Sequence, residues 1–151
     1  TFVVNGEGAA RGGLERSAAD VVNVRFVDYQ PVERLPEVLA TGDVHVVPLR
    51  SGLGDVSVPS KAYSSLAAGR PIVASTDAGS EIPRLLAAAG AGIAVAPDDV
   101  DEFVEALHGV LADPRAAAEM GERGRRWAVD EASPAAVGAA YERLLSSQRR
   151  T

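Results

Sequence analysis

Cysteine is absent from the 151-residue chain, and this excludes both a disulfide framework and a thiolate metal site. The two histidines, His45 and His108, lie far apart in sequence, so we expect no structural metal. No apolar run approaches the roughly 20 residues of a membrane-spanning helix. The opening residues are also too few, and lack the basic flank, for a signal peptide. The sequence therefore predicts a soluble, cytoplasmic protein.

Positive charge is also scarce. Fifteen basic residues stand against twenty-one acidic ones, for a net charge of −6. Because nucleic-acid backbones require a basic surface, this balance argues against a nucleic-acid partner. A chain of this length buries roughly 70% of its unfolded surface, so we expect a single domain over residues 1–151.

Short apolar segments alternate with helical patterns. We expect strands at residues 1–5, 24–27, 44–49, 72–74 and 92–96. We expect helices at residues 14–20, after Pro31, between Pro59 and Gly69, and at 80–89, 100–112, 115–129 and 133–147. Single helices between short apolar strands indicate parallel β-α units covered on both faces. The prediction is an α/β, Rossmann-like doubly wound parallel sheet with a helical C-terminal end.

Ligands of such sheets bind beyond the carboxyl ends of the strands. The candidate site segments are therefore residues 6–11, 28–30, 49–61, 75–81 and 97–98. Among them, Lys61 lies in the first turn of a helix, where the helix dipole favours an acid. A cation at that place fits a bound anion better than it fits helix stability. The alternative is a solvated surface lysine.

The helix at Lys61 also has two stripes. One is expected to pack and the other to face the ligand. The packing stripe holds Ala62, Tyr63, Leu66 and Ala67, and the polar stripe holds Ser60, Lys61, Ser64 and Ser65.

The turn from Gly6 to Arg11 half-matches a dinucleotide-binding fingerprint. Asp28 lies twenty residues beyond Gly8, where a ribose-binding acid is expected. However, Arg11 occupies the place of the third glycine, which close helix–strand packing needs. The alternatives left open are an NAD-binding domain of an oxidoreductase, a tight turn without a ligand, and a non-catalytic α/β domain that binds a partner.

From Phe2 to about Leu145 the chain resembles the C-terminal, nucleotide-sugar-binding domain of the retaining, GT-B fold glycosyltransferases called family 4. The resemblance is carried, in order, by VVNGEGAARGGLE, VRFVDYQPVERLPEVLATGDVHVVPL, VPSKAYSSLAAGRPIVAS and DAGSEIPRLLAAAGAGIAVAPDD. The Val-Pro-Ser-Lys form is most similar to transferases that build surface polysaccharides. The resemblance implies a metal-independent hexosyltransferase that uses a UDP-sugar, with a GDP-sugar as the alternative, and no cofactor.

The resemblance also implies roles for particular residues. The diphosphate contacts it implies are Ser57, Ser60 and Lys61, with Arg11 second. The base and ribose contacts are Tyr29, Gln30 and Ser64. The sugar-facing positions are Asp55, Val56 and Glu81. Two family glutamates are replaced here, by Val56 and Ser64, and Glu81 has the alternative role of a helix-start carboxylate. No catalytic residue is visible, and the base is expected in an N-terminal acceptor domain.

The family's first strand, Gly-Arg turn and lysine-bearing helix do not precede Thr1. If the strand order is the usual 3-2-1-4-5-6, the first two strands here are not joined to the last three. We therefore expect a part of a longer protein, inactive alone, or a strand swapped from a second copy. The acceptor is expected to be a glycan, a lipid-linked sugar or a small molecule.

Basic residues gather near the end of the chain. They are Arg123, Arg125, Arg126, Arg149 and Arg150. The simplest interpretation is a solvated face, because acidic residues are interleaved on the same helix. The alternative is a weak contact with the inner face of a membrane.

Overall fold

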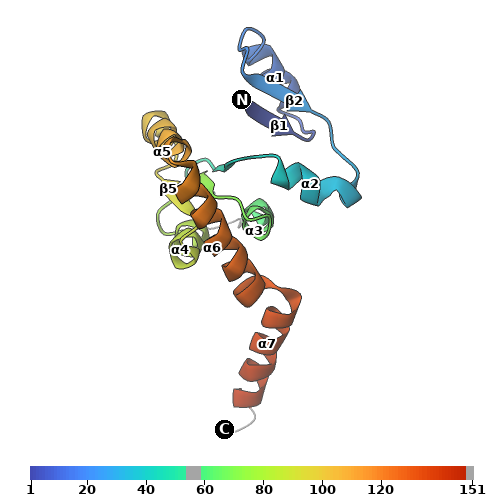
Figure 1. Cartoon of the computed structure of the whole chain (residues 1–151), viewed down its shortest axis with the longest axis vertical. Helices are drawn as coiled ribbons and strands as arrows, with labels where there is room; N and C mark the ends of the chain where they lie inside the picture. Colours follow the sequence, from blue (N-terminus) through green and yellow to red (C-terminus); the bar gives the residue numbers. More distant parts are fainter. Residues whose placement is uncertain (54–58, 149–151) are drawn as a thin grey trace. The chain divides into compact units, whose positions relative to one another are not determined.

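A computed structural model describes residues 1–53 and 59–148 of the chain (Figure 1). Its elements are β1 (Phe2–Asn5), α1 (Arg11–Ser17), β2 (Val24–Val27), a 3-10 turn η1 (Val32–Arg34), α2 (Leu35–Ala40), β3 (His45–Pro48), α3 (Ser60–Ala67), β4 (Ile72–Ser75), α4 (Glu81–Ala89), β5 (Gly92–Val95), α5 (Val100–Ala112), α6 (Pro114–Ala132) and α7 (Pro134–Gln148). The α/β class, the parallel pairing and the helical end are confirmed. None of the described helices is both long and apolar enough to cross a bilayer.

The described strands form two separate parallel sheets. One contains β1 and β2, and the other has the order β3-β4-β5. The expectation that the first two strands are not joined to the last three is therefore confirmed. The chain divides at the same place into two compact units, residues 1–42 and 43–151. A single donor domain over the whole chain stays a prediction.

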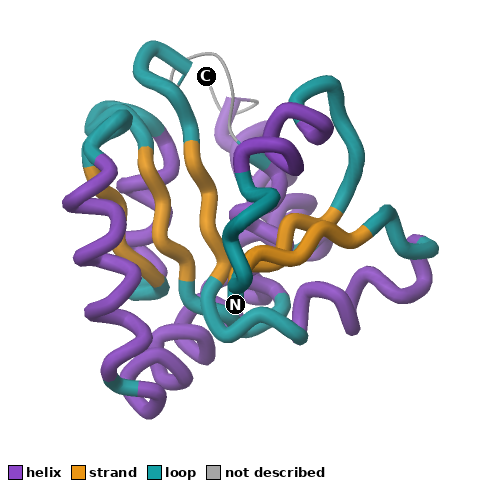
Figure 2. Tube along the Cα trace, turned by 90° about the horizontal axis from the view of Figure 1, so that it is seen from above, coloured by secondary structure: helices purple, strands orange, loops and turns teal. Residues whose placement is uncertain are grey.

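The second unit is organised around β4, all four residues of which are buried. Ile72 and Ala74 face a cluster formed with α3, α4 and α6, whereas Val73 faces a second cluster with α5. Successive side chains of a strand point to opposite faces, so β4 is covered on both sides. Figure 2 shows the strands in orange among the purple helices. This is the doubly wound arrangement that the sequence predicts.

Helix α6 packs closely against the rest of the second unit through small residues. Gly121 and Gly124 are buried, and a Cβ at Gly121 would lie 2.1 Å from the carbonyl oxygen of Gly69, just after α3. Trp127, two turns further on, meets Tyr63 of α3 with ring centroids 6.3 Å apart. Helix α6 therefore packs against α3, the helix that carries Lys61.

The basic residues of α6 have structural contacts. Arg123 donates from Nε to the carbonyl oxygen of Gly90 at 2.9 Å, and the side chain of Arg125 lies against Gly69. Arg126 is 3.9 Å from Glu122. The other two members of the cluster, Arg149 and Arg150, lie outside the described residues. Arg123 and Arg125 therefore do more than form a solvated face.

The first unit is built on the parallel pair β1–β2, in a register that runs from Phe2 opposite Val24 to Asn5 opposite Val27. Helix α1 connects the two strands. Every residue from 1 to 42 is at least partly exposed. These residues therefore form no hydrophobic core of their own.

Two local predictions were wrong. Helix α1 begins at Arg11, three residues earlier than expected, because Arg11 pairs with Glu15 one turn ahead and so supports the first turn. In α3, Ser65 is buried and Ala67 is exposed, the reverse of the expected stripes. Ser65 tolerates burial because its hydroxyl donates to the carbonyl oxygen of Lys61 at 2.8 Å.

Candidate functional site

The N-terminus of α3 forms the first part of the candidate site. Pro59 precedes the helix in an extended conformation, and the first turn contains no acidic residue and no side-chain cap. The N–H of Ala62 donates to the carbonyl oxygen of Pro59 at 3.0 Å, so among residues 1–53 and 59–148 the N–H groups of Ser60 and Lys61 are the ones left for water or a ligand. Ser60 and Lys61 are both exposed there. Three predicted contacts, Asp55, Val56 and Ser57, lie outside the described residues.

Lys61 is the single lysine of the chain. It forms no ion pair with another residue of the described ranges 1–53 and 59–148. A cation and open N–H groups in the same turn form a place where a phosphate is stabilised twice, by charge and by hydrogen bonds. This is the chemistry that the sequence predicts for Lys61.

Ser64 lies one turn further along α3 and is half-buried. Its hydroxyl donates to the carbonyl oxygen of Ser60 at 3.3 Å. A serine hydroxyl that donates in this way still has lone pairs that accept a hydrogen bond. The predicted ribose contact at Ser64 is compatible with this geometry and stays a prediction.

The loop after β3 is tied to the loop after β4 by Asp77, a contact that sequence reasoning missed. The Asp77 carboxylate accepts a hydrogen bond from the backbone N–H of Gly52 at 2.9 Å. Behind it, the hydroxyls of Thr76 and Ser80 lie 2.9 Å apart, and Ser80 donates to the carbonyl oxygen of Asp77 at 2.7 Å. The carboxyl ends of β3 and β4 are therefore braced. The sequence signal that could have indicated this contact was an acid two residues after a buried strand.

Ser80 and Glu81 begin α4. Ser80 is the residue before the helix, and its hydroxyl caps no helix N–H. Glu81 lies in the first turn and pairs with Arg84 at 3.1 Å. Both features match a helix-start carboxylate that complements the dipole. The alternative role of Glu81, facing a sugar, stays a prediction.

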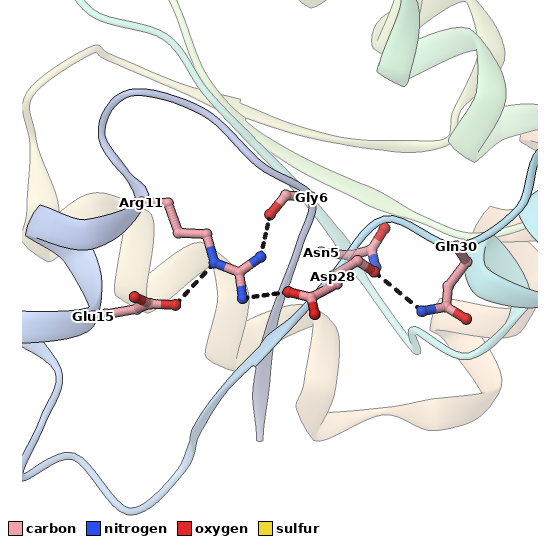
Figure 3. A network of polar contacts seen from close by, with 6 residues as sticks. All are labelled: Asn5, Gly6, Arg11, Glu15, Asp28 and Gln30. Carbon is pink, nitrogen blue, oxygen red and sulfur yellow. Dashed lines mark hydrogen bonds and ion pairs between the residues drawn. The ribbon is translucent and has the colours of Figure 1, made fainter.

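In the first unit, Arg11 is the centre of a polar cluster (Figure 3). Its Nε donates to Glu15 at 2.8 Å, one terminal nitrogen donates to the carbonyl oxygen of Gly6 at 2.8 Å, and the other lies 2.8 Å from the carboxylate of Asp28. The hydrogen bond to Glu15 first, and Asp28 second, raise the pKa of Arg11 above its ordinary value. The guanidinium is therefore charged at every working pH.

The Asp28 carboxylate pairs with Arg11, although the sequence placed it as a ribose-binding acid. The Asp28 carbonyl oxygen accepts from the Asn5 side chain at 2.9 Å and from Gln30 Nε2 at 3.1 Å. Sequence reasoning missed Asn5, which is the last residue of β1. The signal was a polar residue at the end of a strand that pairs with the strand leading to Asp28.

Tyr29 and Gln30 follow directly. Tyr29 is 68% exposed, and its ring lies against Gly6, where an added Cβ would be 3.5 Å from the ring. Within the described part of the chain, neither residue makes a backbone-to-backbone hydrogen bond. Their main-chain groups are therefore open to a ligand, as the sequence predicts for base binding.

Residues 1–113 match the family described as "Glycosyl transferases group 1". The chain belongs to this family. One relative of this group 1 chain is the GDP-mannose-dependent alpha-(1-6)-phosphatidylinositol monomannoside mannosyltransferase of Mycolicibacterium smegmatis. It is 37% identical over 142 residues, which are 90% of this chain.

A second relative of the group 1 chain is the putative colanic acid biosynthesis glycosyl transferase WcaI of Escherichia coli. It is 30% identical over 117 residues, 76% of this chain. The chain spans 37% of the mannosyltransferase and 29% of WcaI. The likeness to surface-polysaccharide transferases that the sequence predicts is therefore confirmed.

Solved structures agree with the fold. Sucrose-phosphate synthase from Thermosynechococcus elongatus superposes with a TM-score of 0.71 at 25% identity, covering 96% of this chain and 38% of that one. WaaG, a glycosyltransferase involved in lipopolysaccharide biosynthesis, has a TM-score of 0.62 at 21% identity and shows the fold alone, covering 83% of this chain and 33% of that one. The GT-B type of this glycosyl transferases group 1 chain is thereby confirmed.

Proposed function

We propose that the chain is the donor-binding part of a glycosyltransferase that transfers a hexose from a nucleoside-diphosphate sugar to an acceptor hydroxyl. The observation that carries this proposal is the N-terminus of α3, where Lys61 and open N–H groups occupy one turn. Family membership supports it. The oxidoreductase alternative loses support for two reasons. Arg11 stands at the position of the third glycine, and it forms an ion pair with the Asp28 carboxylate, which a ribose would need.

The proposed roles follow from chemistry. Ser60 and Lys61, with the N–H groups of α3, receive the diphosphate, and Ser64 accepts or donates a ribose hydrogen bond. The open backbone groups of Tyr29 and Gln30 bind the base. Asp55, Val56 and Glu81 are the candidates for facing the sugar, and a helix-start carboxylate is the alternative role of Glu81.

Two sources bear on the identity of the nucleotide base. The family resemblance implies a UDP-sugar with a GDP-sugar as the alternative, whereas the mycobacterial relative is named for GDP-mannose. We therefore propose that the donor is a UDP- or GDP-sugar, and the assay below separates the two. A lipid-linked sugar is the acceptor class that this relative's name suggests. The cytoplasm, at the inner face of the membrane, is the location that we propose for the reaction.

The proposed mechanism is retaining and does not require a metal. The acceptor oxygen forms its bond to the anomeric carbon on the face from which the diphosphate leaves, the bond from that carbon to the diphosphate oxygen breaks, and the hydroxyl proton passes to the base expected in the N-terminal acceptor domain. Negative charge builds on the leaving diphosphate, so positive charge placed there lowers the barrier. The ammonium of Lys61 and the dipole of α3 supply positive charge at that position. We expect donor binding to be unchanged when EDTA is added.

The test is a titration of the intact protein with UDP and GDP. Replacing Lys61 by Ala removes one charge-assisted hydrogen bond, worth about 1.5–3 kcal/mol, so the dissociation constant rises about ten- to hundred-fold. Arg115→Ala is the matched control, since the Arg115 side chain is 90% exposed and pairs with Glu119 one turn along the same helix. It removes the same charge and leaves binding unchanged.

Amine labelling gives a second readout of the same contact. Lys61 is exposed, so an acylating reagent modifies it, and bound nucleoside diphosphate slows that modification in peptide mass spectra. The proposal is wrong if neither nucleotide binds, or if the Lys61→Ala variant binds as tightly as the parent.

A further inference from the structure

The guanidinium of Arg11 is surrounded by negative charge. Two carboxylates, those of Glu15 and Asp28, each lie 2.8 Å from one of its nitrogens, and a third nitrogen donates to the carbonyl oxygen of Gly6. One positive charge therefore faces two negative ones. An arriving diphosphate would meet a locally negative group, and like charges repel at this range.

The three partners of Arg11 come from three different segments. Gly6 belongs to the turn after β1, Glu15 to α1, and Asp28 to the segment after β2. Figure 3 shows the guanidinium between these segments. Its planar fork of donors fixes their mutual geometry in a way that a lysine, as a point charge, does not. Arg11 thus cross-links the loops at the carboxyl ends of both strands.

The residues after β2 are held at further points. The carbonyl oxygen of Asp28 accepts two side-chain hydrogen bonds, from Asn5 and Gln30, and Arg34 donates to Gln30 Oε1 at 3.4 Å. The ring of Tyr29 lies against Gly6, whose φ of +126° is a conformation that glycine adopts without strain. The Tyr29 ring contacts Gly6 and the Gln30 side chain is hydrogen-bonded to neighbouring residues, whereas the main chain of both residues makes no backbone-to-backbone hydrogen bond within the described residues.

We infer that Arg11 is a positioning residue that, through Asp28, holds the main chain of Tyr29 and Gln30 in the geometry that binds the nucleotide base. This inference rests on the proposed function, because the base is that of the donor. It replaces the direct diphosphate contact that the sequence suggests for Arg11.

The experiment compares ligands with and without phosphates. The intact protein and its Arg11→Ala variant are titrated with uridine and UDP, and with guanosine and GDP, by NMR for the nucleosides and calorimetry for the diphosphates. A positioning residue affects both members of a pair equally, and we expect each dissociation constant to rise about three- to ten-fold. A diphosphate contact would weaken UDP or GDP and leave the nucleoside unchanged, which would overturn the inference.

Two further variants guard against a simple loss of folding. Asp28→Asn keeps the size of the side chain and removes its charge, so it should reproduce the equal weakening. The Arg11→Ala/Asp28→Asn double variant should bind no more weakly than the worse single variant, because both changes break one contact. Additive effects would contradict the inference. Arg16→Ala, on the same helix and exposed, is the control and should bind like the parent.

The outcomes also separate this inference from the proposed function. If the parent protein binds neither a nucleoside nor a diphosphate, the proposed function is wrong. If the parent binds both and the Arg11→Ala variant, folded by circular dichroism, also binds both unchanged, only the positioning role is wrong.

Discussion

Gly121 of α6 offers the sharpest test of how the second unit is packed. Replacing it by Ala places a Cβ 2.1 Å from the carbonyl oxygen of Gly69 and 2.8 Å from the carbonyl carbon. Both are backbone atoms, so no side chain can rotate away. Because Gly69 itself has a φ of +72°, its turn has little freedom to adjust. The expected response is a displacement of α6 from α3.

The size of the effect follows from two opposing terms. Overpacking a filled interior costs about 1–3 kcal/mol, and the clash here is with the backbone, which favours the upper end. Alanine recovers up to about 1 kcal/mol of helix propensity relative to glycine. We therefore expect Gly121→Ala to lower the free energy of unfolding by about 2 kcal/mol, equivalent to a melting temperature about 4–8 °C lower.

Urea unfolding followed by circular dichroism measures this change. Gly109→Ala is the matched control, because Gly109 lies in α5 with no atom within 4 Å of its added Cβ. The control should raise stability by up to about 1 kcal/mol through propensity alone. If the two variants prove equally stable, the close contact between α6 and the turn after α3 is refuted.

Two smaller predictions concern hydrogen bonds. Ser80→Ala leaves the hydroxyl of Thr76, which is 1% exposed, without its 2.9 Å partner, and should lower the free energy of unfolding by about 1–3 kcal/mol. The exposed Ser147→Ala is its control and should change stability little. Asp113→Ala removes the cap of α6, whose carboxylate accepts from two backbone N–H groups at 3.0 Å, and should cost about 1 kcal/mol in thermal unfolding, with Asp113→Asn near the parent.

The order and type of the elements could be predicted because they depend on local patterns. The bounds of β2 and α5 coincide with those expected, since an alternating apolar run and an Asp N-cap are both local signals. The start of α1 could not be predicted from local patterns, because Arg11 in its first turn forms ion pairs with Glu15 and with Asp28 of another segment. Likewise, the burial of Ser65 depends on what packs over α3.

The candidate site divides in the same way. The position of Lys61 at a helix start follows from Pro59 and the apolar stripe beside it, and the structure places it there, exposed. The role of Arg11 does not follow from its sequence neighbours. Its charge is compensated by Asp28, and only the parallel register of β1 and β2 brings that carboxylate to it.

By itself, the sequence determined that this is an α/β chain of alternating strands and helices with a cation at the start of α3, because periodicity, caps and breakers act over a few residues. Only the tertiary structure decided which charged side chains are already paired within the protein and which helix glycines cannot be replaced by alanine without a clash. Gly109 and Gly121 are both helix glycines in the sequence, yet only Gly121 has a backbone oxygen where its side chain would be. Such differences depend on distances between segments remote in the chain, which no local pattern encodes.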